Sequence, residues 1–275
     1  MINIEHFEIN GWQNKKISID LRYISSDIPM IPIIYIHGYK GFKDWGANNL
    51  LADSFAEKNF LFLKFNFSHN GVSSEYPQDF VDLDAFGNNN YLIELNELLI
   101  VIEWLENSDL PIVFSQLSVI GHSRGGGIAL LGSVQDSRIQ KTITWASVCD
   151  FSSRFPNDKL KWESSGVSYV QNGRTKQMMP LYYQFYESFI KNKELLDLPR
   201  QCKKIQQKVL IIHGEDDRSV SFSEAKFLDD LIPFSILVPI KNTNHTFGAY
   251  HPYKSFEIPN GLKLAIEASV KFLRG

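Results

Sequence analysis

Two stretches near the start of the chain alternate apolar and polar residues. They run from Ile4 to Ile9 and from Lys16 to Tyr23. Such alternation is typical of strands with one face toward solvent. The Asn10-Gly11 pair that separates them is a strong hairpin signal, so an antiparallel pair of strands is expected at the start of the fold.

Several later stretches are almost continuously apolar, as expected for strands that are buried on both faces of a parallel sheet. They are "IPIIYIHG" from Ile31, Phe60–Phe67, 115–121, 141–147, Lys208–Gly214 and Phe234–Ile240. Segments with helical spacing of apolar residues lie between or after them, at 49–60, from Tyr91, at 124–133, 221–231 and 261–275. This alternation predicts an α/β fold with a mostly parallel sheet of about eight strands flanked by helices. The polar stretch 68–90 is expected to be a long loop.

Residues 150–205 break the alternation of strands and helices. "VSYV" and "TKQMM" flank Asn172-Gly173, which predicts a second hairpin. After Pro180, "LYYQFYESFI" places aromatic residues at helical spacing. We therefore expect a lid (cap) insertion at 150–205 within a single domain of residues 1–275.

The aromatic residues of this insertion have two interpretations. They line a substrate pocket, or they form the core of the insertion itself. The substrate-binding candidates on the helix are Tyr182, Phe185 and Tyr186, and Trp162 and Tyr169 have the same two interpretations.

Composition excludes several classes of protein. The 275 residues are 44% hydrophobic and 21% charged, which is ordinary for a globular domain. The net charge of −3 gives no reason to expect nucleic acid or an anionic membrane as a partner.

The chain has neither a signal-peptide pattern nor a run of about 20 apolar residues, so a cytoplasmic location is expected. Cys149 and Cys202 are expected to be reduced thiols, with a disulfide between them left open. A homodimer is also left open.

The stretch "IGHSRGGG", residues 120–127, surrounds one serine with glycines. A buried strand precedes it and a helix follows. In this context Gly121-His122-Ser123-Arg124-Gly125 is the G-x-S-x-G pattern of a sharp strand-to-helix turn that exposes a nucleophile. The other interpretation is a glycine-rich helix start that binds phosphate or only packs.

A nucleophilic serine needs a histidine base and a carboxylate that orients it. His245 and His251 follow the last predicted strand, and His245 lies in the polar loop "KNTNHTFG". We favour His245 and keep His251 as the alternative. The carboxylate is expected among Glu215, Asp216 and Asp217, which follow a buried strand at the sheet edge where such sites gather.

These motifs resemble the α/β-hydrolases, from about Ile31 to the end of the chain. "HGYKG", "GHSRGG", "HGEDDRSV" and "NHTF" carry the resemblance. It implies the α/β-hydrolase fold and a triad of Ser123, Asp217 and His245. It also implies an oxyanion hole formed by the backbone N–H groups of Tyr39 and Arg124. More loosely, the chain resembles small bacterial esterases of the cinnamoyl/feruloyl esterase and dienelactone hydrolase-like groups, although the dienelactone hydrolases proper carry cysteine as nucleophile.

The expected activity is hydrolysis of small or medium acyl or aryl esters, with no metal or organic cofactor. A thioesterase, an acyltransferase or a peptidase with the same triad is the alternative, as is a silent hydrolase fold that only binds a ligand. The Arg124 side chain is expected to form a structural salt bridge, with an anionic substrate group as the second option. The acids of the loop, Glu75, Asp79, Asp82 and Asp84, are expected to be solvated rather than to bind a metal.

Overall fold

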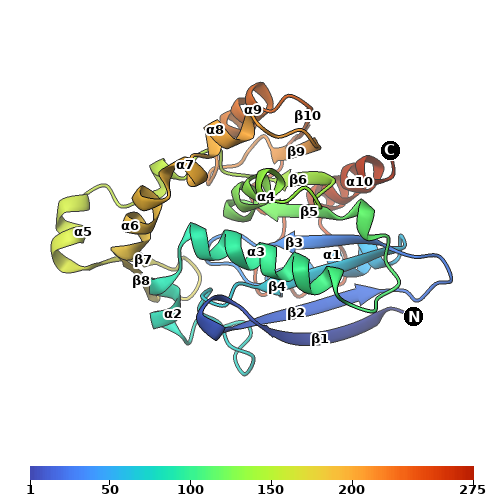
Figure 1. The fold of residues 1–275 in the computed structure, drawn as a ribbon, viewed down its shortest axis with the longest axis horizontal. Coiled ribbons are helices and arrows are strands. Elements are labelled where there is room, and N and C mark those ends of the chain that lie inside the picture. The colour runs from blue at the N-terminus through green and yellow to red at the C-terminus, as the bar shows by residue number, and fades with distance from the viewer.

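An eight-stranded sheet forms the centre of the structure, a computed structural model that describes residues 1–275 (Figure 1). Its strand order is β1-β2-β4-β3-β5-β6-β9-β10. The strands are β1 (Asn3–Asn10), β2 (Lys16–Tyr23), β3 (Ile31–Ile36), β4 (Phe60–Asn66), β5 (Ser118–His122), β6 (Lys141–Trp145), β9 (Lys208–Gly214) and β10 (Ser235–Ile240).

The pairing of the strands follows the sequence patterns. β1 pairs antiparallel with β2, and β2 with β4, whereas the remaining neighbours are parallel. Every residue of β4 is buried, Lys64 and Asn66 included, while β1 alternates between exposed and half-buried positions. The predicted mostly parallel sheet of about eight strands and the first hairpin are therefore confirmed.

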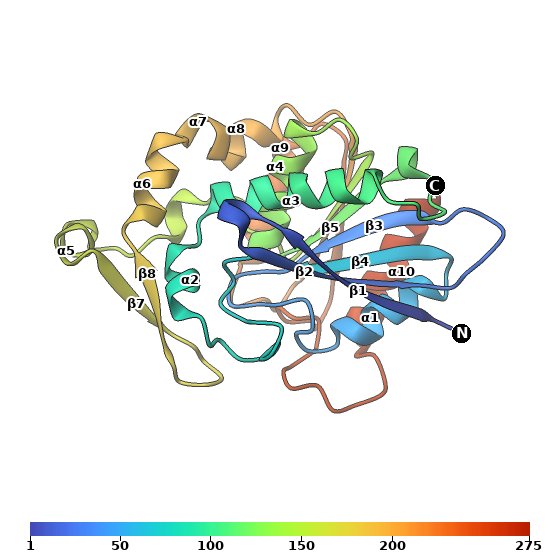
Figure 2. The same cartoon turned by 60° about the horizontal axis from the view of Figure 1, so that its bottom comes forward.

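Helices cover both faces of this sheet (Figures 1 and 2). On one face, α1 and α10 pack in one hydrophobic cluster, and on the other face α3, α4 and α9 contribute to a larger one. The helices are α1 (Asn48–Ala56), α2 (Leu83–Asn88), α3 (Tyr91–Glu106), α4 (Arg124–Gln135), α5 (Lys159–Ser165), α6 (Gln184–Lys191), α7 (Lys193–Leu196), α8 (Leu198–Cys202), α9 (Phe222–Leu231) and α10 (Asn260–Arg274). Short 3₁₀ turns are η1 (Trp12–Asn14), η2 (Phe114–Gln116) and η3 (Ser152–Arg154).

The chain between β6 and β9 leaves the main sheet and forms a unit at one end of the molecule (left in Figure 1). Here β7 (Val167–Gln171) and β8 (Met178–Tyr182) form a separate two-stranded antiparallel sheet, which is the predicted second hairpin. Trp162, Phe185 and Phe189 of this segment are buried in the same cluster as α3 and α4. The insertion is therefore packed onto the body of the domain by its aromatic side chains.

Residues 68–90 differ from the expected long loop, because they contain the six-residue helix α2. The side chain of Asp82 accepts a hydrogen bond from the N–H of Ala85 and so caps α2 at its first turn. A helix of this length carries too little periodicity to be recognised in the sequence.

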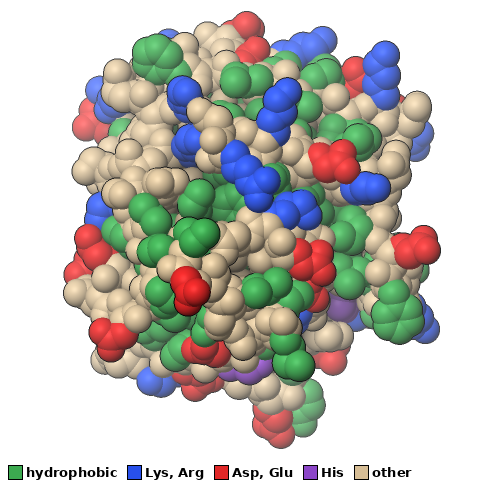
Figure 3. Space-filling view, turned by 90° about the vertical axis from the view of Figure 1, so that its right-hand side faces the viewer, with side chains coloured by type: hydrophobic (Ala, Val, Ile, Leu, Met, Phe, Trp, Pro, Cys, Tyr) green, Lys and Arg blue, Asp and Glu red, His purple; other side chains and the backbone are tan.

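The structure contains no group of three or more His, Cys, Asp or Glu side chains arranged to hold a metal ion, and both cysteines are free. None of its helices is both long enough and apolar enough to cross a membrane. The end of the molecule opposite the insertion carries Lys and Arg side chains intermixed with acidic and hydrophobic ones (Figure 3).

A charged cluster lies inside the fold, between β2, β4 and the loop after β3. The ammonium of Lys64 is fully buried in the middle of β4 and lies 2.6 Å from a carboxylate oxygen of Asp20. It also pairs with Asp44, and Lys43 bridges the same two carboxylates at 2.8 and 2.6 Å. Burial alone would raise the pKa of Asp20, but the ammonium groups of Lys64 and Lys43 hold it well below its usual range. The cluster is thus a buried set of charges in which each one has a partner.

Candidate active site

Ser123 occupies a strained turn between β5 and α4. Its backbone has φ 56° and ψ −119°, a conformation that a residue with a side chain rarely adopts. Its N–H donates to the carbonyl of Trp145 on the neighbouring strand at 2.9 Å, which fixes the turn to the sheet. The sequence motif thus forms the expected sharp turn from strand to helix.

Two glycines make this turn sterically feasible. A Cβ at Gly121 would lie 2.2 Å from the carbonyl oxygen of Gly125, and a Cβ at Gly125 would lie 2.3 Å from that of Ile36. Both obstacles are backbone atoms, which cannot rotate away. The crossing of β3, β5 and α4 at Ser123 therefore leaves no room for a side chain at either position.

We expect Gly125→Ala to lower the free energy of unfolding by about 3 kcal/mol or more, because the added methyl group must displace the backbone of β3. Urea denaturation of the purified variant measures this loss. Gly173→Ala is the matched control, since a Cβ there meets no atom within 4 Å and its φ is not positive. It should change stability by less than about 0.5 kcal/mol. Equal stability of the two variants would contradict the tight crossing.

Asp217 and His245 form a close pair at the carboxyl ends of β9 and β10. Nδ1 of His245 donates to Oδ2 of Asp217 at 2.7 Å. The other oxygen, Oδ1, accepts from the N–H groups of Ser219 and Val220 at 2.8 and 2.9 Å. Burial would raise the pKa of this carboxyl, but its hydrogen bonds from histidine and backbone donors hold it well below its usual range. Asp217 is therefore a buried carboxylate that fixes the orientation of the His245 ring.

A second histidine supports the same carboxylate. His213, at the end of β9, is fully buried, and its Nε2 lies 3.2 Å from Oδ2 of Asp217 and 2.9 Å from the carbonyl of Val220. A carbonyl only accepts, so Nε2 carries the proton and donates it to the carbonyl of Val220, with Oδ2 of Asp217 close to the same N–H group. Nδ1 of His213 has no partner. The sequence alone did not indicate this role of His213, although the "HG" at the end of a buried strand marks its position.

His122, inside the serine turn, holds the loop of His245. Its Nε2 donates to the carbonyl of His245 at 2.9 Å, and the two rings lie 4.8 Å apart. Burial lowers the pKa of His122 to about 3, so its ring is neutral at physiological pH. The residue before the serine therefore connects the serine turn to the histidine loop.

The structure separates the sequence alternatives for base and acid. His251 accepts a hydrogen bond from the N–H of Gly46 at 3.0 Å and packs against Phe42, away from Ser123. Glu215 and Asp216 are exposed. Among the candidate acids and bases, only Asp217 and His245 lie within hydrogen-bond distance of each other.

The backbone N–H groups of Tyr39 and Arg124 were predicted to form the oxyanion hole. Neither N–H donates to a backbone carbonyl in the structure. A Cβ on Gly38, the residue before Tyr39, would lie 3.0 Å from Cβ of Ser123, so this loop passes directly beside the serine. Arg124 is the first residue of α4, where N–H groups have no partner within the helix. The two amides are therefore available next to Ser123.

His37, which sequence analysis left without a role, holds this loop. Its Nδ1 donates to the carbonyl of Gly38 at 2.9 Å, and its Nε2 accepts from the N–H of Phe67 at 3.4 Å. Burial lowers the pKa of His37 to about 4. The neutral ring thus ties the end of β3 to the end of β4.

This burial predicts a dependence of stability on pH. Well above pH 6.5, His37 is neutral in both the folded and the unfolded chain, so its contribution to the stability of the fold is fully present. As the pH falls toward 4, the unfolded chain takes up a proton that the folded one excludes, and stability decreases by up to about 1.4 kcal/mol per pH unit. We expect urea denaturation between pH 7.5 and 4.5 to show this loss, and His37→Gln to show a shallower slope. An identical slope would contradict the assignment.

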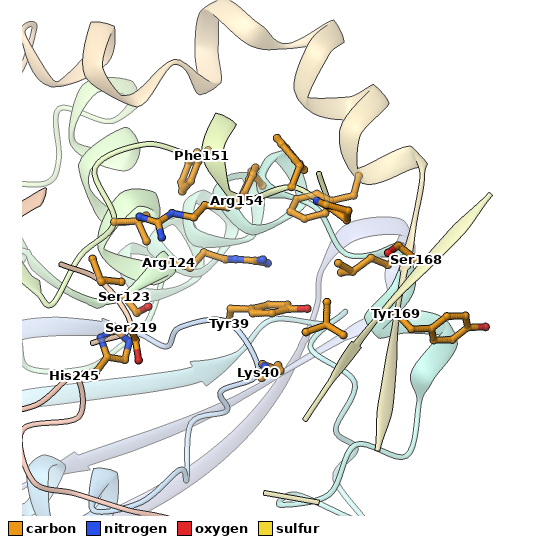
Figure 4. Close-up of a pocket in the computed structure, with 18 residues that line it drawn as sticks. Tyr39, Lys40, Ser123, Arg124, Phe151, Arg154, Ser168, Tyr169, Ser219 and His245 are labelled. Atoms are coloured by element: carbon orange, nitrogen blue, oxygen red, sulfur yellow. The ribbon is translucent and has the colours of Figure 1, made fainter. Parts of the chain in front are cut away.

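A cavity of about 660 Å³ opens at Ser123 and extends under the insertion (Figure 4). This volume is in the range of small-molecule sites. Below, "the Ser123 cavity" means the space lined by Tyr39, Lys40, Tyr91, Ser123, Arg124, Val148, Phe151, Arg154, Phe155, Pro156, Ser168, Tyr169, Val170, Leu181, Phe185, Ser219, Val220 and His245.

Of the three substrate-binding candidates in the insertion, one lines the cavity and two lie elsewhere. Phe185 lines the Ser123 cavity, as expected. Tyr182 and Tyr186 do not line it, which corrects their prediction. Strand side chains alternate between faces, so Leu181 faces the cavity while the hydroxyl of Tyr182 donates to Asp84 on the other side.

Tyr186 packs instead within the insertion, against Phe155 and Trp162. The indole of Trp162 is buried there and donates to the carbonyl of Leu181 at 2.7 Å, whereas Tyr169 lines the cavity. Some aromatic residues of the insertion therefore line the cavity, and others form the core of the insertion itself.

The Arg124 side chain forms the expected structural salt bridge. Its guanidinium lies 3.2 Å from a carboxylate oxygen of the buried Glu94. It also stacks over the ring of Tyr39, with 4.2 Å between its Cζ and the ring centroid. Glu94 lies in the predicted helix after Tyr91, but no sequence pattern indicated this contact.

Solved structures of known proteins share this architecture over the whole chain. The putative hydrolase from Agrobacterium vitis S4 has a TM-score of 0.74 at 17% identity, with 99% of each chain covered. Est1E from Butyrivibrio proteoclasticus with bound ferulic acid has a TM-score of 0.73 at 16% identity, with 98% of each chain covered. The mouse alpha/beta hydrolase domain-containing protein 10 has a TM-score of 0.72 at 15% identity, again with 98% of each chain covered. No protein-family model and no curated protein matches the chain. The likenesses confirm the predicted α/β-hydrolase fold.

Proposed function

We propose that this chain with the α/β-hydrolase fold is a serine hydrolase that cleaves carboxylic esters. The observation that carries the proposal is the Asp217–His245 pair, 2.7 Å apart, at a cavity into which a strained turn presents Ser123. Asp217 keeps the proton of His245 on Nδ1, so Nε2 is free to act as a base.

In the proposed reaction, Oγ of Ser123 attacks the ester carbonyl while His245 takes its proton. The N–H groups of Tyr39 and Arg124 bind the negative charge that develops on the carbonyl oxygen. The tetrahedral intermediate then collapses to an acyl-enzyme, and His245 returns the proton to the leaving alcohol. Water, activated by His245, attacks the acyl-enzyme and releases the acid and the free Ser123. This chemistry uses no metal or organic cofactor.

The shape of the Ser123 cavity supports a small or medium substrate with an apolar or aromatic part. The aromatic side chains of Tyr91, Phe151 and Phe185 line part of it. The similar structure of Est1E holds ferulic acid, an aromatic acid, which supports an aryl acyl group among the substrates.

The test is hydrolysis of 4-nitrophenyl butyrate by the wild type, by Ser123→Ala and by Ser164→Ala as a control on the exposed surface of α5. We expect turnover by the wild type and the control, and at least a 10⁴-fold loss in Ser123→Ala. Butyryl thioester and anilide analogues in the same assay distinguish a thioesterase or a peptidase. A folded wild type that cleaves none of them would contradict the proposal and favour a silent ligand-binding protein.

A further inference from the structure

The charges around the Ser123 cavity are unequal. Its lining includes three cationic side chains, those of Lys40, Arg124 and Arg154, and no Asp or Glu. Two of these three cations are paired with carboxylates that do not line the cavity. Arg124 pairs with Glu94, and Arg154 pairs with Glu224 through both carboxylate oxygens.

Lys40 is the cation that remains without a carboxylate. It belongs to the loop after β3, next to the predicted oxyanion donor Tyr39, and no acidic group lies within salt-bridge distance of its ammonium in the structure. Its one polar contact is the carbonyl of Gln171 at the end of β7, at 3.4 Å. Burial and the nearby charge of Arg124 lower the pKa of Lys40, so the ammonium lies where an added negative charge would stabilise it.

The neighbouring tyrosines add unpaired polar groups to the same wall. The hydroxyls of Tyr39 and Tyr91 are both buried, and neither has a hydrogen-bond partner. Arg124 and Lys40 lie on opposite sides of the Tyr39 ring, with Cζ at 4.2 Å and Nζ at 5.3 Å from its centroid (Figure 4). Two hydroxyl donors and an unbalanced ammonium are the groups that an anion with several oxygen atoms would satisfy.

The backbone conformation of Lys40 is a second sign that this position serves a ligand. Its φ is 54°, in the left-handed region that is costly for a residue with a side chain. Such strain concentrates at ligand sites, where the surrounding structure maintains it. The loop thus holds a long cationic side chain at the cavity in a conformation that glycine would adopt more readily.

From this arrangement we propose that the Ser123 cavity binds esters that carry a carboxylate group, and that Lys40 pairs with this carboxylate beside the Tyr39 hydroxyl. This substrate class rests on the proposed function, since Ser123 must be the nucleophile. The carboxylate belongs either to the acyl group or to the leaving group, and the two cases need different substrates.

The kinetic test measures a selectivity ratio, which is kcat/KM for an anionic ester divided by kcat/KM for its neutral partner. One pair is 4-nitrophenyl hydrogen glutarate and 4-nitrophenyl methyl glutarate, with the charge on the acyl group. The other is 4-(butyryloxy)benzoate and its methyl ester, with the charge on the leaving group. In the wild type we expect a ratio above one for at least one pair, and that pair identifies the charged side.

Lys40→Met removes the charge and retains the length of the side chain, and methionine meets the same backbone strain at φ 54°. We expect it to lower the ratio by about 10- to 100-fold, the size of a lost hydrogen bond to a charged group. Lys40→Arg should retain most of the ratio. Lys161→Met, on the exposed surface of α5, is the control and should leave the ratio as in the wild type.

A ratio that Lys40→Met leaves unchanged would overturn the proposal, because a lysine that only connects the loop to Gln171 affects both substrates alike. A wild-type preference for the neutral ester in both pairs would overturn it as well.

Binding to Ser123→Ala separates this proposal from the proposed function, because it requires no turnover. Calorimetric titration with 4-(butyryloxy)benzoate and its methyl ester compares the same two ligands on an inactive protein. Tighter binding of the anion by at least tenfold, lost on adding Lys40→Met, would support the subsite even if no ester is cleaved. Equal binding of the two ligands would overturn it even if the chain proves to be an esterase.

Discussion

Replacement of Asp217 by Asn is expected to lower kcat for ester hydrolysis by about 10⁴-fold, the effect that this change has in a Ser-His-Asp triad. Oδ2 of Asp217 accepts the Nδ1 proton of His245 at 2.7 Å, whereas an amide nitrogen at that position donates. The imidazole then carries its proton on Nε2 and is unable to take the proton of Ser123. KM should change little, because Asp217 is absent from the cavity wall.

The neighbouring residue provides the matched control. Asp216 is exposed, so Asp216→Asn should retain kcat within about twofold. Thermal unfolding of both variants checks that Asp217→Asn is folded under the assay conditions, since Oδ1 of Asp217 also accepts two backbone hydrogen bonds. A folded Asp217→Asn variant with kcat within tenfold of the wild type would remove Asp217 from the mechanism.

Lys64→Met is expected to lower the free energy of unfolding by about 3–5 kcal/mol at pH 7, the cost of breaking a buried ion pair from one side. Lys64 has no exposed side-chain surface, and its ammonium contacts the carboxylates of Asp20 and Asp44. Methionine fills a similar volume but leaves these two negative charges with Lys43 as their remaining lysine partner. Urea denaturation at constant ionic strength measures the loss.

The control for this substitution is Lys16→Met at the exposed start of β2, where the ammonium contacts only Asn10. It should change stability by less than about 0.5 kcal/mol. The double variant Lys64→Met/Asp44→Asn should recover part of the loss, because it removes one of the two uncompensated charges. A loss below 1 kcal/mol in Lys64→Met would show that the cluster is solvated rather than buried.

The positions that the sequence predicted well are those set by neighbouring residues in the chain and by the order of the strands. The turn at Ser123 depends on Gly121 and Gly125, which flank it in sequence. Asp217 follows the buried strand β9 and His245 follows the edge strand β10, and parallel strands bring their carboxyl ends to one edge of the sheet. For such residues, local pattern and sheet topology together determine the position.

The supporting residues could not be found in this way, because their partners are distant in the chain. His122 holds the carbonyl of His245, and Glu94 pairs with Arg124 from a different helix. Tyr182 was misplaced for a related reason. Helical spacing suggested that it shares a face with Phe185, but it is the last residue of β8 and its side chain follows the alternation of a strand.

Other expectations stay predictions. Residues 150–205 line part of the cavity as an inserted unit, and their role as a lid stays a prediction. The same holds for the cytoplasmic location, for the absence of nucleic-acid and membrane partners, and for the oligomeric state.

The most direct test of the central claim is covalent labelling with a fluorophosphonate, read as the intact mass of the protein. We predict a single adduct on the wild type and on Ser164→Ala, and none on Ser123→Ala, because only a serine activated by His245 displaces fluoride from the reagent. Peptide mapping should place the adduct in the peptide that contains Ser123. A folded wild type without an adduct, or an adduct that persists in Ser123→Ala, would contradict the assignment of Ser123 as the nucleophile.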